Sequence, residues 1–221
     1  MKHAQISAQI EASISRGDLA PGDRLPPERT LAEEYGVSRM TRRQALQTLE
    51  SRGLLRRAIG RSGGSFVAEP KLERDLGASL SAQLAKQGVR AGAEVLLARD
   101  DGDAVEIVRV RLADGEPFAL ERSRFPSDRF AGLLKLDLTG SLYELLADHF
   151  DAAPVRAIER LEPVLANADE AAVLRVQEGA PLMLVDRTAY DDAGLVVETA
   201  RDVFRGDRTR IVAWTSELVQ S

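Results

Sequence analysis

The start of the chain has the patterns of two helices. Ile6, Ile10 and Ile14 lie four residues apart, and Gly17 follows at a point where a helix can end. A turn-rich connector comes next. A second helix is then expected over about 27–35, because proline occupies its first position.

A third helix and a strand–turn–strand pattern complete this N-terminal region. Ser38 is a good N-cap for a helix that runs to Gly53. Residues 54–59 and 65–68 have the pattern of two strands around a glycine-rich tip. Three helices followed by a hairpin predict a winged helix-turn-helix over residues 1–68.

The rest of the chain mixes helical and strand patterns behind a charged, weakly patterned stretch. We place an interdomain linker in that stretch, at residues 69–78, and a second domain at residues 79–221. The order of the elements fits an α+β domain built on an antiparallel sheet. Helices are expected at about 76–87, 141–150 and 168–174, and strands at about 106–113, 118–124, 155–165, 182–190 and 195–203.

Composition limits the classes of function. The chain has 221 residues, 44% hydrophobic and 29% charged, as is usual for soluble globular proteins. No apolar run approaches the roughly 18 residues of a membrane span, and the N-terminus lacks the apolar core of a signal peptide, which indicates a cytoplasmic protein. The absence of cysteine excludes disulfides, thiol nucleophiles and zinc–thiolate sites. With two histidines only, we expect no metal, cofactor or catalytic residue.

The net charge of −5 is unevenly distributed. Residues 1–70 hold 11 Lys/Arg against 8 Asp/Glu, whereas residues 71–221 hold 19 against 27. A basic N-terminal third on an acidic body is typical of a nucleic-acid module joined to another domain. Ordinary scatter of charge is the alternative on this observation alone.

Cationic and hydroxyl side chains gather on the first turns of the third helix. Arg39 and Arg43 lie four residues apart on one face, beside Thr41 and the capping Ser38. Arginine binds guanine O6 and N7 or clamps phosphate, and the N–H groups of a helix start also favour phosphate. This layout predicts a helix that enters the DNA major groove by its N-terminus. For any one arginine, a solvated helix face is the alternative.

Two further places extend the predicted DNA contact. Arg29 opens the preceding helix within reach of the DNA backbone, and Arg61 lies in the glycine-rich tip. Gly63 and Gly64 permit close approach of this tip to a groove. Together with the third helix, these residues indicate a DNA-binding module.

Short segments in a fixed order between residues 5 and 68 carry a family resemblance. They include Pro21-Gly22-Asp23-Arg24-Leu25-Pro26, Val37-Ser38-Arg39-Met40-Thr41, Arg43-Gln44-Ala45-Leu46, Gly53-Leu54, Gly60-Arg61 and Phe66-Val67. In these segments the chain resembles the DNA-binding domain of GntR-type bacterial regulators. The resemblance implies DNA contacts by Arg29, Arg39, Thr41, Arg43 and the glycines of the wing.

Arg42 departs from the family pattern, in which a small aliphatic residue is usual. By helical spacing it falls with Ala45, Leu46 and Leu49, towards the core. We expect its side chain either to extend to solvent or to make an additional DNA contact. The wing tip, 61–64, is also longer than the common family form.

Four segments of the C-terminal half carry a second resemblance. They are residues 108–121, 140–146, 178–182 and 190–208. They are similar to the UTRA effector domain of the HutC branch of the same regulators. The resemblance implies a chorismate-lyase-like fold, in which an antiparallel sheet with flanking helices forms a ligand cleft.

Two arginines form a candidate anion site in this half. Arg109 and Arg111 lie two apart on an expected strand, so both side chains leave the same face. Paired guanidinium groups bind anions, and Ser141, at a helix N-terminus, adds a hydroxyl and backbone donors, unless it is only a cap. The alternative is that both arginines form surface ion pairs with a nearby carboxylate: Asp114, Glu116 or Glu121.

The UTRA resemblance implies further residues of the cleft. In relatives that bind phosphosugars, the positions of the two arginines and of Ser141 hold phosphate, often with serines at the positions of Ser79 and Ser81. Glutamates at the positions of Glu121 and Glu198 take ligand hydroxyls. Two departures are that Phe204 stands where sugar-phosphate binders often have tyrosine, and that the segment 96–104 is shorter than in relatives. The implied effector site is Ser79, Ser81, Arg109, Arg111, Glu121, Ser141, Glu198 and Phe204.

Three classes of function were weighed. An enzyme would share its fold with chorismate lyase, but no nucleophile–base pair can be identified, and His149 stands alone on a helix. An architectural DNA-binding protein would not need the large acidic C-terminal domain. We therefore predict a ligand-responsive, sequence-specific transcriptional regulator. We expect a homodimeric repressor that binds a palindromic operator in double-stranded DNA, has no membrane partner, and responds to a small anionic metabolite, a phosphosugar or a carboxylate.

Overall fold

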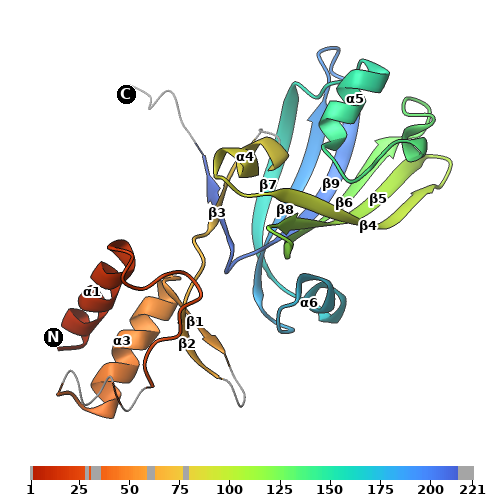
Figure 1. Cartoon of the computed structure of the whole chain (residues 1–221). Helices are drawn as coiled ribbons and strands as arrows, with labels where there is room; N and C mark the ends of the chain where they lie inside the picture. The colour runs from red at the N-terminus through yellow and green to blue at the C-terminus, as the bar shows by residue number, and fades with distance from the viewer. Residues whose placement is uncertain (1, 28–29, 31–35, 59–62, 77–79, 214–221) are drawn as a thin grey trace, which may run out of the picture. The chain divides into compact units, whose positions relative to one another are not determined.

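The chain divides into two compact units, residues 1–70 and 71–221, which are described separately (Figure 1). In this computed structural model the described residues are 2–27, 30, 36–58, 63–76 and 80–213. Among the described residues, no helix has the length and apolar content needed to cross a membrane. Within the same ranges, no cluster of His, Asp and Glu is arranged to hold a metal ion.

The first unit is built from helices and one hairpin. Helix α1 (Lys2–Ser15) packs against helix α3 (Arg39–Ser51), and strands β1 (Leu55–Ala58) and β2 (Gly64–Val67) pair antiparallel. The expected first and third helices and the two wing strands are thus confirmed. The helix expected over 27–35 lies almost wholly outside the described residues. The core of the unit comprises Ile6, Ile10, Leu25, Ala45, Leu46, Leu49, Leu55 and Val67.

Arg42 belongs to the buried face of α3. It is only 5% exposed and lies on the same stripe as Ala45, Leu46 and Leu49. The helical spacing therefore predicted its direction correctly. The expectation that its side chain extends to solvent is wrong, because a side chain so deeply buried is not solvated.

The second unit is an antiparallel six-stranded sheet in the order β4-β5-β6-β9-β8-β7. Helices α5 (Leu142–Phe150) and α6 (Ala168–Leu174) pack on it, and a short 3-10 helix, η1 (Leu133–Lys135), precedes α5. The strands are β4 (Ala91–Asp100), β5 (Ala104–Ala113), β6 (Glu116–Pro126), β7 (Arg156–Leu165), β8 (Pro181–Tyr190) and β9 (Val196–Arg205).

Most of these elements agree with the sequence pattern, and the α+β architecture is confirmed. Helix α6 has the expected bounds, and Asn167 caps it through a reciprocal bond with Glu170. Strand β4 was not expected. It is an edge strand that is largely exposed from Glu94 onwards, so it lacks the alternation of buried and exposed positions by which strands are recognised.

The stretch expected as the linker contains a strand. Residues Leu72–Asp75 form β3, which pairs in parallel with β10 (Thr209–Val212) near the end of the chain. Helix α4 (Leu80–Lys86) lies beside β3 (Figure 1). Local sequence does not reveal β3, because its partner strand is far away in the chain.

One face of the sheet carries two apolar clusters with a polar band between them. The first cluster joins Phe125 and Ile107 to helix α5, and the second joins Phe118 and Phe204 to Leu84 of α4. The opposite face packs on α6. Because side chains alternate along a strand, the residues between the two clusters on the first face point to the same side of the sheet.

Substituting Leu49 tests the core of the first unit. Leu49 is fully buried, so Leu49→Ala is expected to lower the free energy of unfolding of this unit by about 2–5 kcal/mol. Met40 in the same helix is 64% exposed, and Met40→Ala is expected to cost less than about 0.5 kcal/mol. Hydrogen exchange of the α3 amides measures both values. Equal effects of the two substitutions would contradict the packing described.

Candidate functional site

The start of α3 is an ordered, exposed helix N-terminus in the first unit. The Ser38 hydroxyl accepts a hydrogen bond from the Thr41 backbone N–H at 3.1 Å and also bonds the Thr41 hydroxyl at 2.9 Å. Arg39 and Arg43 are exposed, whereas Thr41 is half-buried. The capping bond fixes the first turn, so the two guanidinium groups project from a rigid support. The structure thus brings together four of the residues expected to contact DNA.

The wing is held by an arginine that the sequence analysis did not single out. Arg24 donates to the Gly63 carbonyl oxygen and lies over the Phe66 ring, with its guanidinium carbon 6.0 Å from the ring centroid. A Cβ added at Gly64 would lie 2.9 Å from Arg24 Nε. Gly64 therefore makes room for this arginine. Arg29 and Arg61, also expected at the DNA interface, lie outside the described residues.

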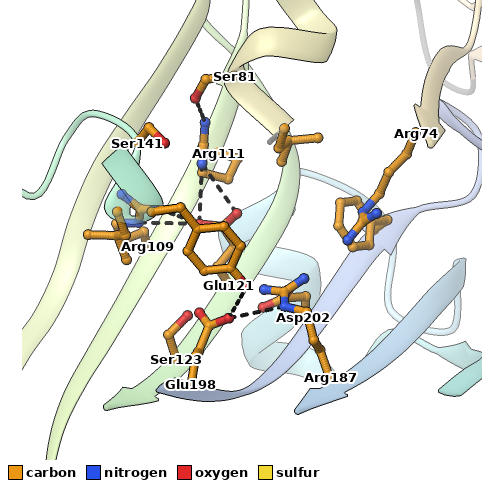
Figure 2. A pocket seen from close by; sticks show the side chains of 14 residues that line it. Arg74, Ser81, Arg109, Arg111, Glu121, Ser123, Ser141, Arg187, Glu198 and Asp202 are labelled. Atoms are coloured by element: carbon orange, nitrogen blue, oxygen red, sulfur yellow. Dashed lines mark hydrogen bonds and ion pairs between the residues drawn. The ribbon is translucent and has the colours of Figure 1, made fainter. Parts of the chain in front are cut away.

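A pocket opens on the polar band of the second unit (Figure 2). Seven of the eight expected effector-site residues line it, and the eighth, Ser79, lies outside the described residues. The lining residues are Arg74, Leu80, Ser81, Arg109, Arg111, Glu121, Ser123, Ser141, Leu142, Tyr143, Arg187, Glu198, Asp202 and Phe204.

Glu121 lies between the two arginines of β5. Its Oε2 is 2.7 Å from Arg109 Nη2, and its Oε1 is 3.3 Å from Arg111 Nη1. Burial tends to raise the pKa of Glu121, but Arg109 and Arg111 outweigh burial and hold this pKa below its ordinary value. The expected alternative of ion pairs with Glu121 is thus correct about the partner. The pairs are buried, however, since each arginine is 3% exposed.

The two arginines have different tasks. Arg109 directs Nε and Nη2 to Glu121, and its Nη1 donates to the carbonyl oxygens of Leu138 and Gly140 at 2.7 and 2.8 Å. These bonds fix the segment before Ser141. Because both terminal nitrogens of its guanidinium make bonds of 2.7 to 2.8 Å to the protein, Arg109 acts mainly as a positioning residue.

Arg111 is held more loosely, at the end of the pocket that contains Ser81 and Ser141. Its Nη1 lies 3.3 Å from Glu121 Oε1 and 3.4 Å from Glu121 Oε2. Its Nε lies 3.4 Å from the Gly92 carbonyl oxygen. Its shortest bond is the 2.8 Å bond from Nη2 to the Ser81 hydroxyl. Ser141 caps α5 by accepting from the Glu144 N–H at 3.4 Å, a long bond. Arg111 and Ser141 thus make long hydrogen bonds, to Glu121 and to the Glu144 N–H, at this end of the pocket.

The other end of the pocket contains a second charge network, centred on Arg187. Arg187 Nε is 3.0 Å from Glu198 Oε2, which also accepts from the Tyr143 hydroxyl at 2.6 Å. Arg187 Nη2 is 3.1 Å from Asp202 Oδ2. Arg74, from β3, lies on the opposite side of the cluster from Ser141 (Figure 2).

Burial and neighbouring charges together set the pKa values in this second network. Burial raises the pKa of Asp202 to about 7, although Arg187 acts against this rise. The pKa of the Tyr143 hydroxyl is also raised, by burial and by the neighbouring Glu198 carboxylate, so the phenol remains a hydrogen-bond donor. Burial lowers the pKa of Arg187, but Glu198 and Asp202 outweigh this and raise it well above its ordinary value.

Arg74, Arg187, Asp202 and Tyr143 were not expected in the site. Arg74 falls in the stretch interpreted as a linker. The other three residues lie on elements that were expected, and alternation along β9 places Asp202 on the same face as Glu198 and Phe204. That signal was available, whereas the alignment of β8 with β9 that adds Arg187 was not.

The arrangement is suited to binding a small polar group. Side chains leave a cavity of about 60 Å³, and one water needs about 10–15 Å³ of such space, so the cavity holds several waters or one phosphate-sized group. The charged lining residues are four arginines and three carboxylates: Arg74, Arg109, Arg111, Arg187, Glu121, Glu198 and Asp202.

Comparison with known protein families assigns both units. Residues 2–67 match the family described as bacterial regulatory proteins, gntR family, and residues 80–210 match the UTRA domain. The transcriptional repressor NagR of Bacillus subtilis is 36% identical, over 97% of this chain and 94% of its own length. The transcriptional repressor PhnF of Mycolicibacterium smegmatis is 31% identical, over 96% of this chain and 92% of its own length.

Solved structures agree with this assignment. The crystal structure of PhnF from Mycobacterium smegmatis aligns with a TM-score of 0.65 at 29% identity, and covers 97% of this chain and 99% of that chain. The effector domain of PhnF, solved by itself, aligns with a TM-score of 0.60 at 27% identity, over 66% of this chain and 99% of that chain.

The raised pKa of Asp202 predicts a pH-dependent stability. An unfolded aspartate titrates near pH 3.9, so folding favours the protonated form between about pH 4 and 7. The stabilisation from this proton is complete below about pH 4 and is lost as the pH rises through about 7. The difference in melting temperature, wild type minus Asp202→Asn, should therefore decrease as the pH rises from about 4 to about 8.

Thermal unfolding of both proteins across this pH range measures the difference. Asp186→Asn, at a partly exposed aspartate paired with Arg201, is the matched control and should show a smaller pH dependence. A wild-type advantage over Asp202→Asn that grows with pH would contradict the assignment.

Proposed function

Because this chain belongs to the gntR family of bacterial regulatory proteins, we propose that it represses transcription until a small anionic metabolite binds its UTRA domain. It is a ligand-responsive DNA-binding transcriptional regulator and not an enzyme, as its families and relatives indicate. Repression is proposed because NagR and PhnF, which it resembles over nearly its whole length, are named repressors. Its place of action would be the cytoplasm, where bacterial DNA lies.

One observation carries the proposal of an anionic ligand. Arg111 is almost completely buried beside the cavity, but its distances to Glu121 are 3.3 and 3.4 Å, near the limit for a hydrogen bond. Charge-assisted bonds are normally 2.7–2.9 Å long. An incoming phosphate or carboxylate would form shorter bonds with Arg111 and would also meet the hydroxyls of Ser81 and Ser141.

The size of the pocket supports a phosphate or carboxylate group. About 60 Å³ of space suits one such group. A larger metabolite would have to displace side chains or extend out of the pocket. Glu198 and Asp202 would then accept hydrogen bonds from its hydroxyl groups, as carboxylates commonly do.

We further propose that the protein acts as a homodimer on a palindromic operator. A two-fold dimer presents two α3 helices to two half-sites, which is the usual arrangement for helix-turn-helix regulators. Exposed apolar side chains on the edge strands β4 and β7 support self-association: Val95, Leu96 and Leu97 on the first, and Ile158 and Leu165 on the second.

Arg39→Ala tests the DNA contact. A bidentate arginine–guanine contact is worth about 1–3 kcal/mol, so the variant should bind DNA roughly 5- to 150-fold more weakly and with relaxed sequence preference. Fluorescence anisotropy on fragments that the wild type selects from random DNA measures the affinity. Repeating the selection with the variant measures the preference.

Arg201→Ala is the matched control for this experiment. Arg201 is an exposed arginine of the second unit, paired with Asp186, and its loss should leave DNA affinity unchanged. Unchanged binding by Arg39→Ala would reject the role assigned to Arg39.

Arg111→Ala tests the anion site. Phosphorylated and carboxylated metabolites are first screened for those that raise the melting temperature of the wild type. The variant should lose the response to each such compound, with affinity reduced at least about tenfold, because a charge-assisted bond contributes about 1.5–3 kcal/mol. Its DNA affinity without the compound should remain that of the wild type.

Arg99→Ala, at an exposed arginine on β4 paired with Glu106, serves as the control and should keep the full response. A normal response by Arg111→Ala would place the ligand elsewhere.

A further inference from the structure

We propose that helix α4 and strand β3 form one rigid element that transmits occupancy of the pocket to the chain segment joining the two units. The inference rests on the proposed function, because its input is an anion bound at Ser81 and Arg111. Its output is β3, which begins two residues after Pro70, the last residue of the first unit.

Helix α4 reaches the pocket by its first turn. Leu80 and Ser81 line the cavity, and the Ser81 hydroxyl accepts the 2.8 Å bond from Arg111 Nη2. On another side, Leu84 is fully packed into the apolar cluster with Phe118 and Phe204. A change at Ser81 is therefore applied to a short helix that is packed as a unit.

Two glutamine side chains fasten α4 to the backbone of β3. Gln83 Oε1 accepts from the Asp75 N–H at 2.6 Å, and Gln83 Nε2 donates to the Asp75 carbonyl oxygen at 2.8 Å. Gln87 repeats this pattern on Glu73, at 2.8 and 2.7 Å. The amides of Gln83 and Gln87, the glutamine clamp, thus pair with β3 as a neighbouring strand would.

The clamp occupies the edge of β3 that faces away from β10. Leu72 donates its backbone N–H to the Arg208 carbonyl oxygen at 2.7 Å, on the β10 side. Backbone groups of alternate residues point to opposite edges of a strand, so Glu73 and Asp75 present theirs to α4. Strand β3 is consequently bonded on both edges, although it is not part of the six-stranded sheet.

Strand β3 also touches the far end of the pocket directly. Arg74 lines the cavity, and its guanidinium carbon lies 5.2 Å from the centroid of the Phe204 ring. Its Nη2 is 3.0 Å from Glu159 Oε1. Glu159 is 3.5 Å from Arg187, the centre of the second charge network. A ligand that spans the pocket would therefore act on β3 from both ends.

The proposed sequence of events starts with competition for Arg111. An anion that accepts from Arg111 replaces its bond to Ser81, and the freed serine hydroxyl turns to donate to the anion. This change displaces the start of α4. Because the glutamine clamp makes four hydrogen bonds to two residues of β3, the strand follows the helix.

Hydrogen exchange on the full chain, with and without inorganic phosphate, tests the proposal. In the wild type, phosphate should change the exchange rate of the Leu72 amide, and of the peptide 70–76, at least twofold. In the double variant Gln83→Ala/Gln87→Ala this phosphate-dependent change should vanish, whereas phosphate should still raise the melting temperature. The Leu72 amide is read because its bond to Arg208 does not involve the clamp.

Two single variants keep the test decisive if the double variant is poorly folded. Gln87 is exposed, so Gln87→Ala should fold normally and reduce the phosphate-dependent change by at least half. Lys86→Ala, at the exposed last residue of α4, is the matched control and should behave as the wild type.

The outcomes separate this inference from the proposed function. If phosphate fails to raise the melting temperature of the wild type, phosphate does not bind the site and the inference falls, whereas the metabolite screen still decides the proposed function. Two other results overturn only the transmission through α4. In the first, phosphate raises the melting temperature but leaves the exchange rate of the β3 amides unchanged. In the second, phosphate changes that rate equally in the wild type and the clamp variants.

Discussion

The buried carboxylate of Glu121 is the point on which the second unit depends. It forms ion pairs with both Arg109 and Arg111, two guanidinium groups that are each 3% exposed. Removing one partner of such a buried pair typically costs about 3–5 kcal/mol, because a buried charge is left uncompensated. Through Arg109 the same carboxylate also fixes Leu138 and Gly140, and hence the start of α5. The pocket and the fold around it therefore share one electrostatic support.

In the proposed site, the lengths of the arginine bonds reconcile stability of the fold with a response to ligand. The terminal nitrogens of Arg109 make bonds of 2.7 to 2.8 Å, whereas Arg111 reaches the Glu121 carboxylate only at 3.3 and 3.4 Å. A stable pocket needs the first condition, because buried charges must be paired. A responsive pocket needs an arginine with long bonds, such as Arg111, because a ligand gains affinity only from groups whose existing bonds are weaker than those it offers. The two arginines, alike in the sequence, divide these requirements between them.

How much of this was predictable depends on the distance between interacting residues along the chain. Local patterns predicted α3, the strands β8 and β9, and the shared face of Arg109 and Arg111, because each depends on residues close in sequence. Family resemblance added Glu121 and Glu198. Arg74 was missed because β3 exists only through its partner β10, and β4 was missed because an exposed edge strand has no burial pattern. Arg187 required the alignment of neighbouring strands, which no local pattern contains.

The pairing of β3 with β10 also bears on the order of folding during synthesis. Lys71 donates to the Gly206 carbonyl oxygen, a contact between residues 135 positions apart, and β10 follows immediately after. Closing so long a loop must wait until β10 has left the ribosome. The first unit has all its core residues long before that point. A nascent chain therefore completes the core of its DNA-binding half first, and β3 gains its partner strand only after β10 has been synthesised.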